Sequence, residues 1–423
     1  MTNSSHVSGR TGGLWSRRKA LKAGAGVAAA GLLGFPAIVR AQSVTIRIGH
    51  LTPMTGFLGT LGEYAVQGIQ MAAEEINAAG GINGRQLAVL SEDSFNPENA
   101  TTKAQRMLER DGVDFLMGEI SSASALAISQ VAARNQKLFI AVGPRSDVLR
   151  AASCSKYMFC IDIPNTVMVN AVGTAHKRDG MVDGKNFYTL TADYVFGHDL
   201  LKAARSFFAD NNATLLGDEL IATDVTDFSP FLLKVRQARP DVVCLNLAGN
   251  QVTNFVKQYA EFGLPFPTVG FNLNTADAWA AGVGNLGGIW PTVWYHTLEN
   301  PKSQAFVQAF QARYNRLPEN HAWISYISLK IMAQALAETQ SSETPALIDY
   351  LESGAEFDIL KDRPAYFRQW DHQLIQEAYS FSVKPEGEAS DEYDMIVLGE
   401  AVPAASESME VIYPTEAQNT CAF

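Results

Sequence analysis

The sequence contains little material for a metal site or for extensive cross-linking. It has four cysteines and seven histidines among 423 residues. No two cysteines have C-x-x-C spacing, and no cysteines and histidines cluster at the spacing of metal ligands. We therefore expect no metal site and no cofactor.

Basic residues are also few. Lysine and arginine number 33 against 44 aspartates and glutamates, which gives a formal net charge of −11 at pH 7. A protein whose main partner is a nucleic acid or an anionic membrane surface needs a basic face. The charge balance argues against both partners, and we expect no nucleic acid.

The motifs of familiar enzyme classes are missing. Neither a Walker loop nor a GxSxG elbow occurs. The run from Gly282 to Gly287 fits GxGxxG, but it follows a helix-like stretch and leads into an extended one, so we interpret it as a flexible turn. The histidines are scattered, and we interpret His198 and His321 as surface or capping residues. The sequence therefore predicts a protein that is not an enzyme.

Beyond the first 41 residues, no stretch is long and apolar enough to cross a membrane. The start of the chain carries Arg17 and Arg18, then an apolar run at residues 23–39, then a small residue at Ala41. This order is typical of a signal peptide, and the paired arginines indicate the twin-arginine export route. The glycine-rich, short run favours cleavage after Ala41 over a membrane anchor. We expect a periplasmic protein whose signal peptide is residues 1–41.

The few cysteines fit an oxidising compartment. Cys244 lies in an apolar, strand-like run, and we interpret it as a buried thiol. Cys154, Cys160 and Cys421 lie in loop-like or terminal sequence, where one disulfide is expected. The residues alone do not determine which two of the three are paired.

What the chain has in quantity is apolar sequence, 47% of its residues, arranged in alternating strand and helix patterns. Strand patterns alternate with amphipathic helices from residue 44 onward, which predicts βαβ units and parallel sheets with helices on both faces. The alternation pauses at residues 143–163, where we expect a loop, and then restarts. The sequence therefore predicts an α/β protein with two doubly wound parallel-sheet lobes.

The chain beyond residue 288 has a different pattern. Two amphipathic helices, at residues 303–314 and 321–338, have no strands of their own and must dock on the existing lobes. Several crossings between the lobes would make a multi-strand hinge that opens and closes. We predict lobe 1 at residues 44–162 plus about 293–355, and lobe 2 at residues 163–292 plus about 356–423.

Ligands of open parallel sheets bind at the carboxyl ends of the strands. The loop at residues 118–124 is rich in serine and leads into a helix, whose N-terminus offers unpaired N–H groups and the positive end of its dipole. This arrangement suits a carboxylate, and the alternative is that Ser121 or Ser122 only caps the helix. The other loops expected at the same cleft are residues 53–62, 143–147, 193–197, 248–251 and 272–274.

At these loops the sequence resembles the branched-chain amino-acid-binding family, the type I periplasmic solute-binding proteins of ABC transporters. The resemblance extends over residues 44–398 and implies two lobes that close on a solute like a venus flytrap. It also implies a monomer whose partner is a membrane permease. The segments that carry it are PMTGFLGTLGEYAVQGIQMAAEEINAAGGINGR (residues 53–85), GEISSASA (118–125), GPRSDVL (143–149), DYVFG (193–197) and FRQWDHQLIQEAY (367–379).

The resemblance implies roles for individual residues. Ser122 matches the serine that binds the ligand carboxylate, and Ser146 takes the place of a threonine in the next loop. Phe196 stands where the family has a tyrosine. The resemblance also implies a disulfide between Cys154 and Cys421. The remaining residues expected at the ligand are Ser121, Ser124, Tyr194, Leu61, Asn250 and Asn272.

Asn272 marks a departure from the family pattern. It falls near the acidic residue that many members use for the ammonium group of an amino acid. An asparagine cannot neutralise an ammonium, and an unpaired charge in a closed cleft is costly. This favours a carboxylate with an apolar or aromatic body, unless Asp193 or Glu119 pairs with an ammonium instead.

The sequence therefore predicts an extracytoplasmic solute receptor of an ABC importer. Its ligand would be a small carboxylate-bearing solute, either an apolar or aromatic carboxylate or an amino acid, held in the cleft between the lobes. The alternative is a ligand-sensing receptor that serves a membrane signalling protein.

Overall fold

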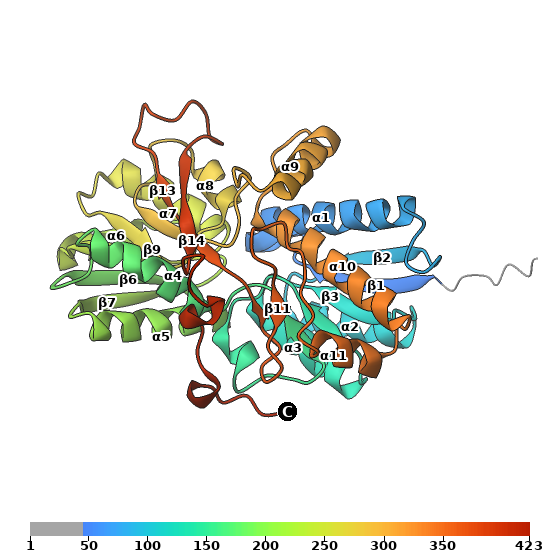
Figure 1. The fold of residues 1–423 in the computed structure, drawn as a ribbon. Helices are drawn as coiled ribbons and strands as arrows, with labels where there is room; N and C mark the ends of the chain where they lie inside the picture. Colours follow the sequence, from blue (N-terminus) through green and yellow to red (C-terminus); the bar gives the residue numbers. More distant parts are fainter. Residues whose placement is uncertain (1–44) are drawn as a thin grey trace, which may run out of the picture. The chain divides into compact units, whose positions relative to one another are not determined.

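In the computed structural model, two parallel β-sheets covered by helices organise residues 45–423, the part of the chain that the structure describes (Figure 1). The first sheet has the strand order β2-β1-β3-β4-β5 and the second has the order β7-β6-β8-β9. We call the first sheet with its helices lobe 1 and the second sheet with its helices lobe 2. The predicted fold class is confirmed. The predicted signal peptide, residues 1–41, lies outside the described residues.

Lobe 1 is built from continuous apolar strands, as expected for parallel strands that are covered on both faces. All four residues of β3 are buried, and β1 pairs with β2 on one side and with β3 on the other. The elements of this part are β1 (Ile46–Thr52), η1 (Gly56–Leu58), α1 (Gly59–Ala78), β2 (Leu87–Asp93), α2 (Pro97–Glu109), β3 (Phe115–Gly118), α3 (Ser122–Arg134), β4 (Phe139–Ala141), η2 (Asp147–Arg150) and β5 (Met158–Cys160).

The prediction that residues 143–163 form a loop was wrong in part. This segment contains the short helix η2 and the edge strand β5, which pairs in parallel with β4. Only the short helix η2 separates β5 from β4, so the alternation of strands with long helices does not indicate this strand.

Lobe 2 repeats the same βαβ arrangement, as predicted. Its strand β8 is buried along its whole length between β6 and β9. The elements are α4 (Asn165–Arg178), β6 (Asn186–Ala192), α5 (Val195–Asp210), β7 (Thr214–Ile221), α6 (Ser229–Ala238), β8 (Val242–Asn246), α7 (Asn250–Phe262), β9 (Thr268–Gly270) and α8 (Thr275–Ala281).

The rest of the chain adds helices to lobe 1 and a small antiparallel sheet beside lobe 2. Helix α10 packs along α1 so closely that a Cβ atom on Gly68 would lie 2.0 Å from the carbonyl oxygen of Ala322. Helix α11 was not expected from the sequence. The elements are β10 (Ile289–Thr292), α9 (Pro301–Tyr314), α10 (Asn320–Thr339), α11 (Thr344–Leu351), β11 (Tyr366–Phe367), β12 (Leu374–Ile375), β13 (Ala378–Val383), β14 (Ile396–Val402), η3 (Met409–Ile412) and η4 (Glu416–Gln418).

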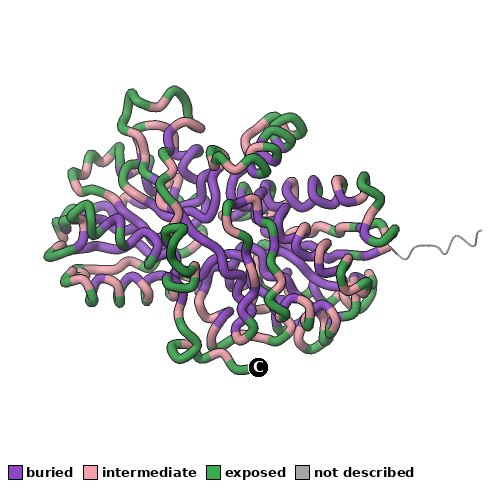
Figure 2. The backbone as a smooth tube through the Cα atoms, in the orientation of Figure 1, coloured by how far each residue is buried: buried purple, intermediate pink, exposed green. Residues whose placement is uncertain are grey.

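Tryptophans anchor the packing of these later elements. Trp294 and Trp323 are fully buried, and their rings stack with centroids 6.0 Å apart. Each indole N–H is satisfied: Trp294 donates to the hydroxyl of Ser303 at 2.9 Å, and Trp323 donates to the carbonyl of Ile359 at 2.9 Å. Figure 2 shows the buried backbone concentrated in the strands and in the helix faces that cover them.

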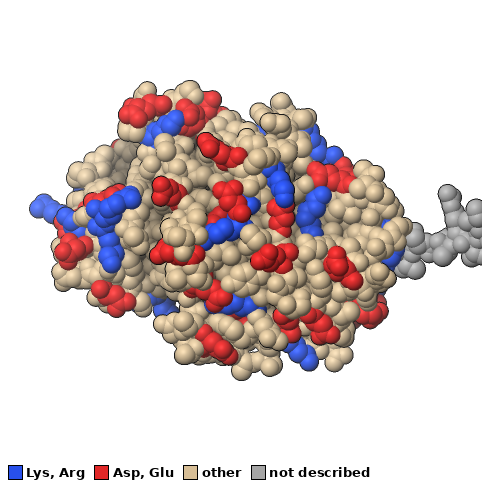
Figure 3. All heavy atoms as spheres, viewed as in Figure 1, with Lys and Arg blue, Asp and Glu red and all other residues tan. Residues whose placement is uncertain are grey.

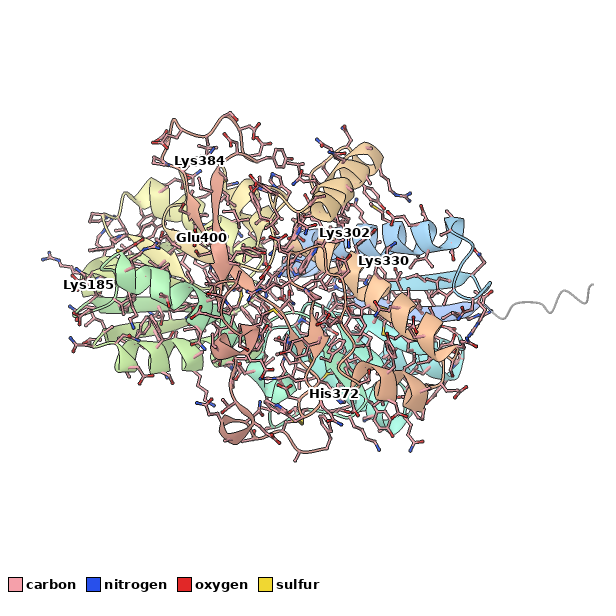
Figure 4. All side chains as sticks on the ribbon, in the orientation of Figure 1. Lys185, Lys302, Lys330, His372, Lys384 and Glu400 are labelled. Atoms are coloured by element: carbon pink, nitrogen blue, oxygen red, sulfur yellow. A yellow bond between two sulfur atoms is a disulfide. The ribbon has the colours of Figure 1, made fainter. Side chains whose placement is uncertain are left out.

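The C-terminal segment, residues 403–423, contacts both lobes. On lobe 2, the carbonyl oxygen of Ile412 accepts a hydrogen bond of 2.9 Å from the side chain of Asn170 on α4. The segment ends beside lobe 1, where a disulfide joins Cys154 to Cys421 with an S–S distance of 2.06 Å. The ring of Phe423 lies 4.4 Å from that of His372, which is labelled in Figure 4. The disulfide is the pair that the family resemblance implied.

We expect that Cys421→Ser lowers the free energy of unfolding by about 2–4 kcal/mol, because the disulfide closes a long loop and restricts the unfolded chain. Urea denaturation of the variant and of the wild type would measure the difference. Reduction of the wild type with dithiothreitol should reproduce the loss, and it should leave the variant unchanged. Equal stability of the oxidised and reduced wild type would contradict a stabilising role for this bond.

Candidate functional site

A small cavity lies between the two lobes, at the carboxyl ends of their strands. Each of the six loops that the sequence singled out contributes at least one residue to its wall. Its volume of about 20 Å³ is room for roughly one water molecule, so the lobes are closed in this structure. The lining residues are Leu58, Leu61, Ile120, Gly143, Arg145, Tyr194, Phe196, Ala248, Asn272, Asn274 and His321.

Four of the residues predicted at the ligand line this cavity: Leu61, Tyr194, Phe196 and Asn272. Tyr194 and Phe196 come from the loop and helix start after β6, and their ring centroids are 5.6 Å apart. Tyr194 also makes an edge contact with Phe57 of lobe 1 at a centroid distance of 5.6 Å. The wall is therefore largely apolar and aromatic, and it is formed by both lobes.

Arg145 supplies the positive charge of the cavity. The residue is 4% exposed, and Nε donates to the carboxylate of Asp162 at 2.7 Å. From lobe 1 the Nη1 group reaches lobe 2, where it donates to Oδ1 of Asn272 at 2.6 Å and to Oδ1 of Asn274 at 3.3 Å. Within residues 45–423, Nη2 has no hydrogen-bond partner in the structure. A buried cation with a free donor beside a cavity can bind a carboxylate.

Sequence reasoning did not assign a role to Arg145, although a signal was present. The residue lies inside the GPRSDVL segment, two positions after Gly143, at the carboxyl end of β4. A charged side chain at a strand end, in a chain with only 18% charged residues, was such a signal. His321 was also misjudged: it is 2% exposed and lines the cavity, whereas we interpreted it as a surface or capping residue.

The serines of the loop after β3 are engaged within lobe 1, and none of them lines the cavity. Ser121 is the N-cap of α3, since its hydroxyl accepts a hydrogen bond of 3.4 Å from the N–H of Ser124. The hydroxyl of Ser122 accepts from the N–H of Ser146 at 3.1 Å, and that of Ser124 donates to the carbonyl of Ser94 at 3.4 Å. Ser122 thus joins the loop after β3 to the loop after β4, and Ser124 joins it to the loop after β2.

Ser146 makes a contact between the lobes. Its hydroxyl donates to the carboxylate of Asp199, which lies on α5 in lobe 2. The same carboxylate oxygen accepts the N–H of Val148 at 3.1 Å. In this closed arrangement Asp199 therefore accepts the hydrogen bonds that Ser146 was expected to offer to the carboxylate of a ligand.

Asn250 and Asp193 were predicted or considered as ligand contacts, but both lie outside the cavity wall in this structure. Asn250 is the first residue of α7 and is exposed, outside the cavity wall. Its neighbour Gly249 instead makes the close approach: a Cβ atom there would lie 2.1 Å from the carbonyl oxygen of Phe57. Asp193 is bound by the exposed His198 at 2.8 Å. Neither Asn250 nor Asp193 contacts the space in which a ligand would lie.

Glu119 is 1% exposed and is held by its own loop. Its Oε1 accepts the N–H groups of Ile120 at 3.0 Å and Ser121 at 2.9 Å, and its Oε2 accepts the hydroxyl of Ser94. Burial raises the pKa of this carboxyl from 4.5 to about 8, against the lowering effect of these hydrogen bonds. The group is therefore a poor partner for an ammonium at neutral pH.

The described residues show two further absences. Among residues 45–423, no group of three or more histidines, cysteines, aspartates or glutamates is placed to hold a metal ion. In the same part of the chain, every helix is too short or too polar to traverse a bilayer.

Comparisons with known proteins agree with this architecture. The family model described as periplasmic binding protein matches residues 45–389. Leu/Ile/Val-binding protein homolog 8 of Brucella abortus is 24% identical over 333 residues, which are 75% of this chain and 82% of that protein. A periplasmic binding protein from Burkholderia mallei has a solved structure that is 26% identical, with a TM-score of 0.82, covering 89% of this chain and 98% of its own.

Another solved structure is that of an ABC transporter solute binding protein from R. palustris in complex with benzoate. It is 21% identical and has a TM-score of 0.75, and the match covers 90% of this chain and 100% of that protein. At this level of identity the likeness concerns the fold.

We expect that Asp199→Ala opens the protein in the absence of any ligand, because it removes both hydrogen bonds that α5 accepts from residues 146 and 148. Small-angle X-ray scattering of the ligand-free variant should give a larger radius of gyration than that of the wild type. Asp210→Ala is the matched control, since it removes an exposed carboxylate from the end of the same helix. Equal radii for Asp199→Ala and the wild type would argue against this contact as a closing force.

Glu119 gives a prediction about pH. The native state keeps a proton up to about pH 8 that the unfolded state releases near pH 4.5, so the wild type should lose stability as the pH rises between these values. Glu119→Gln has no proton to release and should lack this part of the slope. Urea denaturation across that range would compare the two proteins, with the exposed Glu338→Gln as the control. Parallel stability curves for Glu119→Gln and the wild type would show that the carboxyl is already ionised in the native state.

Proposed function

The chain belongs to the family of periplasmic binding proteins, and we propose that its ligand is a small carboxylate with an apolar or aromatic body. The protein is the solute receptor of an ABC importer. Proteins of this family bind solutes and are not enzymes, so no chemistry on the ligand is assigned to the cleft.

The observation that carries the ligand proposal is Arg145 in a wall of apolar and aromatic side chains. The free Nη2 group supplies a donor for a carboxylate oxygen, and the buried surroundings strengthen this charge-assisted hydrogen bond. Leu58, Leu61, Tyr194 and Phe196 offer apolar surface for the body of the solute. A few convergent polar groups in an apolar pocket are typical of small-molecule sites.

Entry of a solute requires the lobes to part, because the closed cavity has a volume of only about 20 Å³. The carboxylate would then replace Asn272 and Asn274 as the acceptor for Nη1 of Arg145. Closure over the bound solute would restore the other contacts between the lobes, such as that of Ser146 with Asp199. The free energy of binding thus shifts an equilibrium between open and closed forms.

An amino acid is the alternative ligand, and the name of the Brucella relative supports it. The ammonium group of an amino acid would need an ionised carboxylate at the cavity. Glu119 is held by N–H groups of its own loop, and Asp277 is buried with its pKa raised to about 7 by desolvation. The benzoate complex of the R. palustris protein supports an aromatic carboxylate. The electrostatics of this chain favour the carboxylate without an ammonium.

The export route and the partners are further parts of the proposal. We infer that residues 1–41 are a signal peptide of the twin-arginine type, cleaved after Ala41, and that the mature protein acts in the periplasm as a monomer that delivers its solute to a membrane permease. On the face shown in Figure 3, acidic and basic side chains are interspersed over both lobes. This mixed surface supports a role in solution.

A thermal-shift screen would test the ligand class. Benzoate and aliphatic carboxylates should raise the melting temperature by a few degrees, since a ligand at a hundred times its Kd stabilises by about 2.7 kcal/mol. Arg145→Gln should weaken the binding of a hit by about 1.5–3 kcal/mol, because it removes a charged hydrogen bond. Isothermal titration calorimetry would measure the change in Kd.

Two variants control this experiment. Arg145→Lys keeps the charge beside the buried carboxylate of Asp162, so it guards against loss of folding in Arg145→Gln. The exposed Arg134→Gln changes the net charge equally and should bind as the wild type does. Stabilisation by amino acids and not by plain carboxylates would reject the proposed ligand class.

A further inference from the structure

His321 is a further polar side chain of the cavity wall with a hydrogen-bonding atom to spare. It lies in the first turn of α10, and it is 2% exposed. Its ring is held by Glu319, the N-cap of that helix, which is 0% exposed. Nδ1 of the histidine lies 3.0 Å from Oε1 and 3.3 Å from Oε2 of this carboxylate.

The contact with Glu319 determines what the other ring nitrogen can do. An ionised carboxylate only accepts hydrogen bonds, so Nδ1 of His321 carries the donated proton when Glu319 is in this form. In the neutral ring Nε2 is then an acceptor with a free lone pair. No hydrogen-bond partner of Nε2 is found among residues 45–423. The contact with Glu319 therefore holds the imidazole so that Nε2 of His321 is an acceptor in a fixed position.

Gly143 leaves the edge of this ring uncovered. A Cβ atom at Gly143 would lie 3.4 Å from Cδ2 and 3.6 Å from Nε2 of His321. Both residues line the cavity, together with Arg145 from the same loop as Gly143. The cavity thus holds a cationic donor on the loop after β4 and, with the imidazole in its neutral form, an acceptor on α10.

We propose that Nε2 of His321 accepts a hydrogen bond from a hydroxyl group of the solute, and that the preferred ligands are hydroxylated aromatic carboxylates. This inference rests on the proposed function, in which Arg145 binds the carboxylate. A site built to accept a hydroxyl discriminates against the analogue without it, because its buried polar atom is then left unpaired. His321 is accordingly a residue that determines specificity.

The test compares benzoate with its 2-, 3- and 4-hydroxy derivatives by isothermal titration calorimetry on the purified protein. The wild type should bind at least one hydroxybenzoate about tenfold more tightly than benzoate. His321→Phe should abolish this preference: the ratio of its Kd for benzoate to its Kd for that hydroxybenzoate should fall from about ten to about one. The exposed His198→Phe is the matched control and should retain the preference.

A second variant tests the role of the proton on Nδ1 without changing the ring. In Glu319→Gln the amide N–H can donate to Nδ1, which moves the ring proton to Nε2 and turns this atom into a donor. The preference for the hydroxybenzoate, measured as the same ratio of Kd values, should fall in this variant as well.

Three outcomes would overturn the inference. The first is equal wild-type affinity for benzoate and all three hydroxybenzoates. The second is an equal loss of benzoate and hydroxybenzoate binding in His321→Phe, which would assign the imidazole to the carboxylate. The third is no binding of any of the four acids, which would reject the proposed ligand class itself and this inference with it.

Discussion

The buried ion pair between Arg145 and Asp162 is the interaction on which the cleft depends. Both side chains are almost fully removed from water, and such a pair is tolerated only when further hydrogen bonds satisfy its remaining atoms. The structure supplies these bonds from both lobes: the N–H of Ile163 donates to Asp162 at 2.8 Å, and the amide oxygens of Asn272 and Asn274 accept from Arg145. The pair thus couples the charge of the cavity to the closed arrangement.

A second arginine ties the same loop to the segment around Gln373. Arg150 donates from Nε to Oε1 of Gln373 at 2.7 Å and from Nη2 to the carbonyl of Asp162 at 2.7 Å. Gln373 forms a β-bridge with Cys160 at the end of β5. These bonds join the loop around Arg145 to the segment that leads to β13 in the sheet beside lobe 2.

The fold was largely readable from the sequence because its signals are local. Continuous apolar strands, helix caps and glycine turns predicted both doubly wound lobes and the six loops at the cleft. Strand β5 was missed because only the short helix η2 separates it from β4, which interrupts the strand–helix alternation, and the eight-residue helix α11 was also missed.

The site was readable only in part, because side-chain partners depend on tertiary and interlobe contacts. Ser146 has the residue type of a ligand-binding serine, yet Asp199 from the other lobe accepts its proton. Asn272 was recognised as unusual, but its partner, Arg145, lies 127 positions away and could not be inferred from spacing. His321 has a neighbouring acid in the sequence at Glu319, a short-range signal that was overlooked. The sequence pattern locates the loops, and the tertiary packing determines which of their atoms face the ligand.

The disulfide between Cys154 and Cys421 has a topological consequence. It closes a covalent ring of the chain, and every strand of the second sheet, from β6 to β9, lies inside that ring. A single cut of the backbone anywhere within the ring, for instance in the acidic hairpin loop between β13 and β14, leaves the protein as one covalent molecule. After such a nick the two lobes stay tethered on both sides of the cut, and the severed halves remain at the high effective concentration that allows them to stay docked.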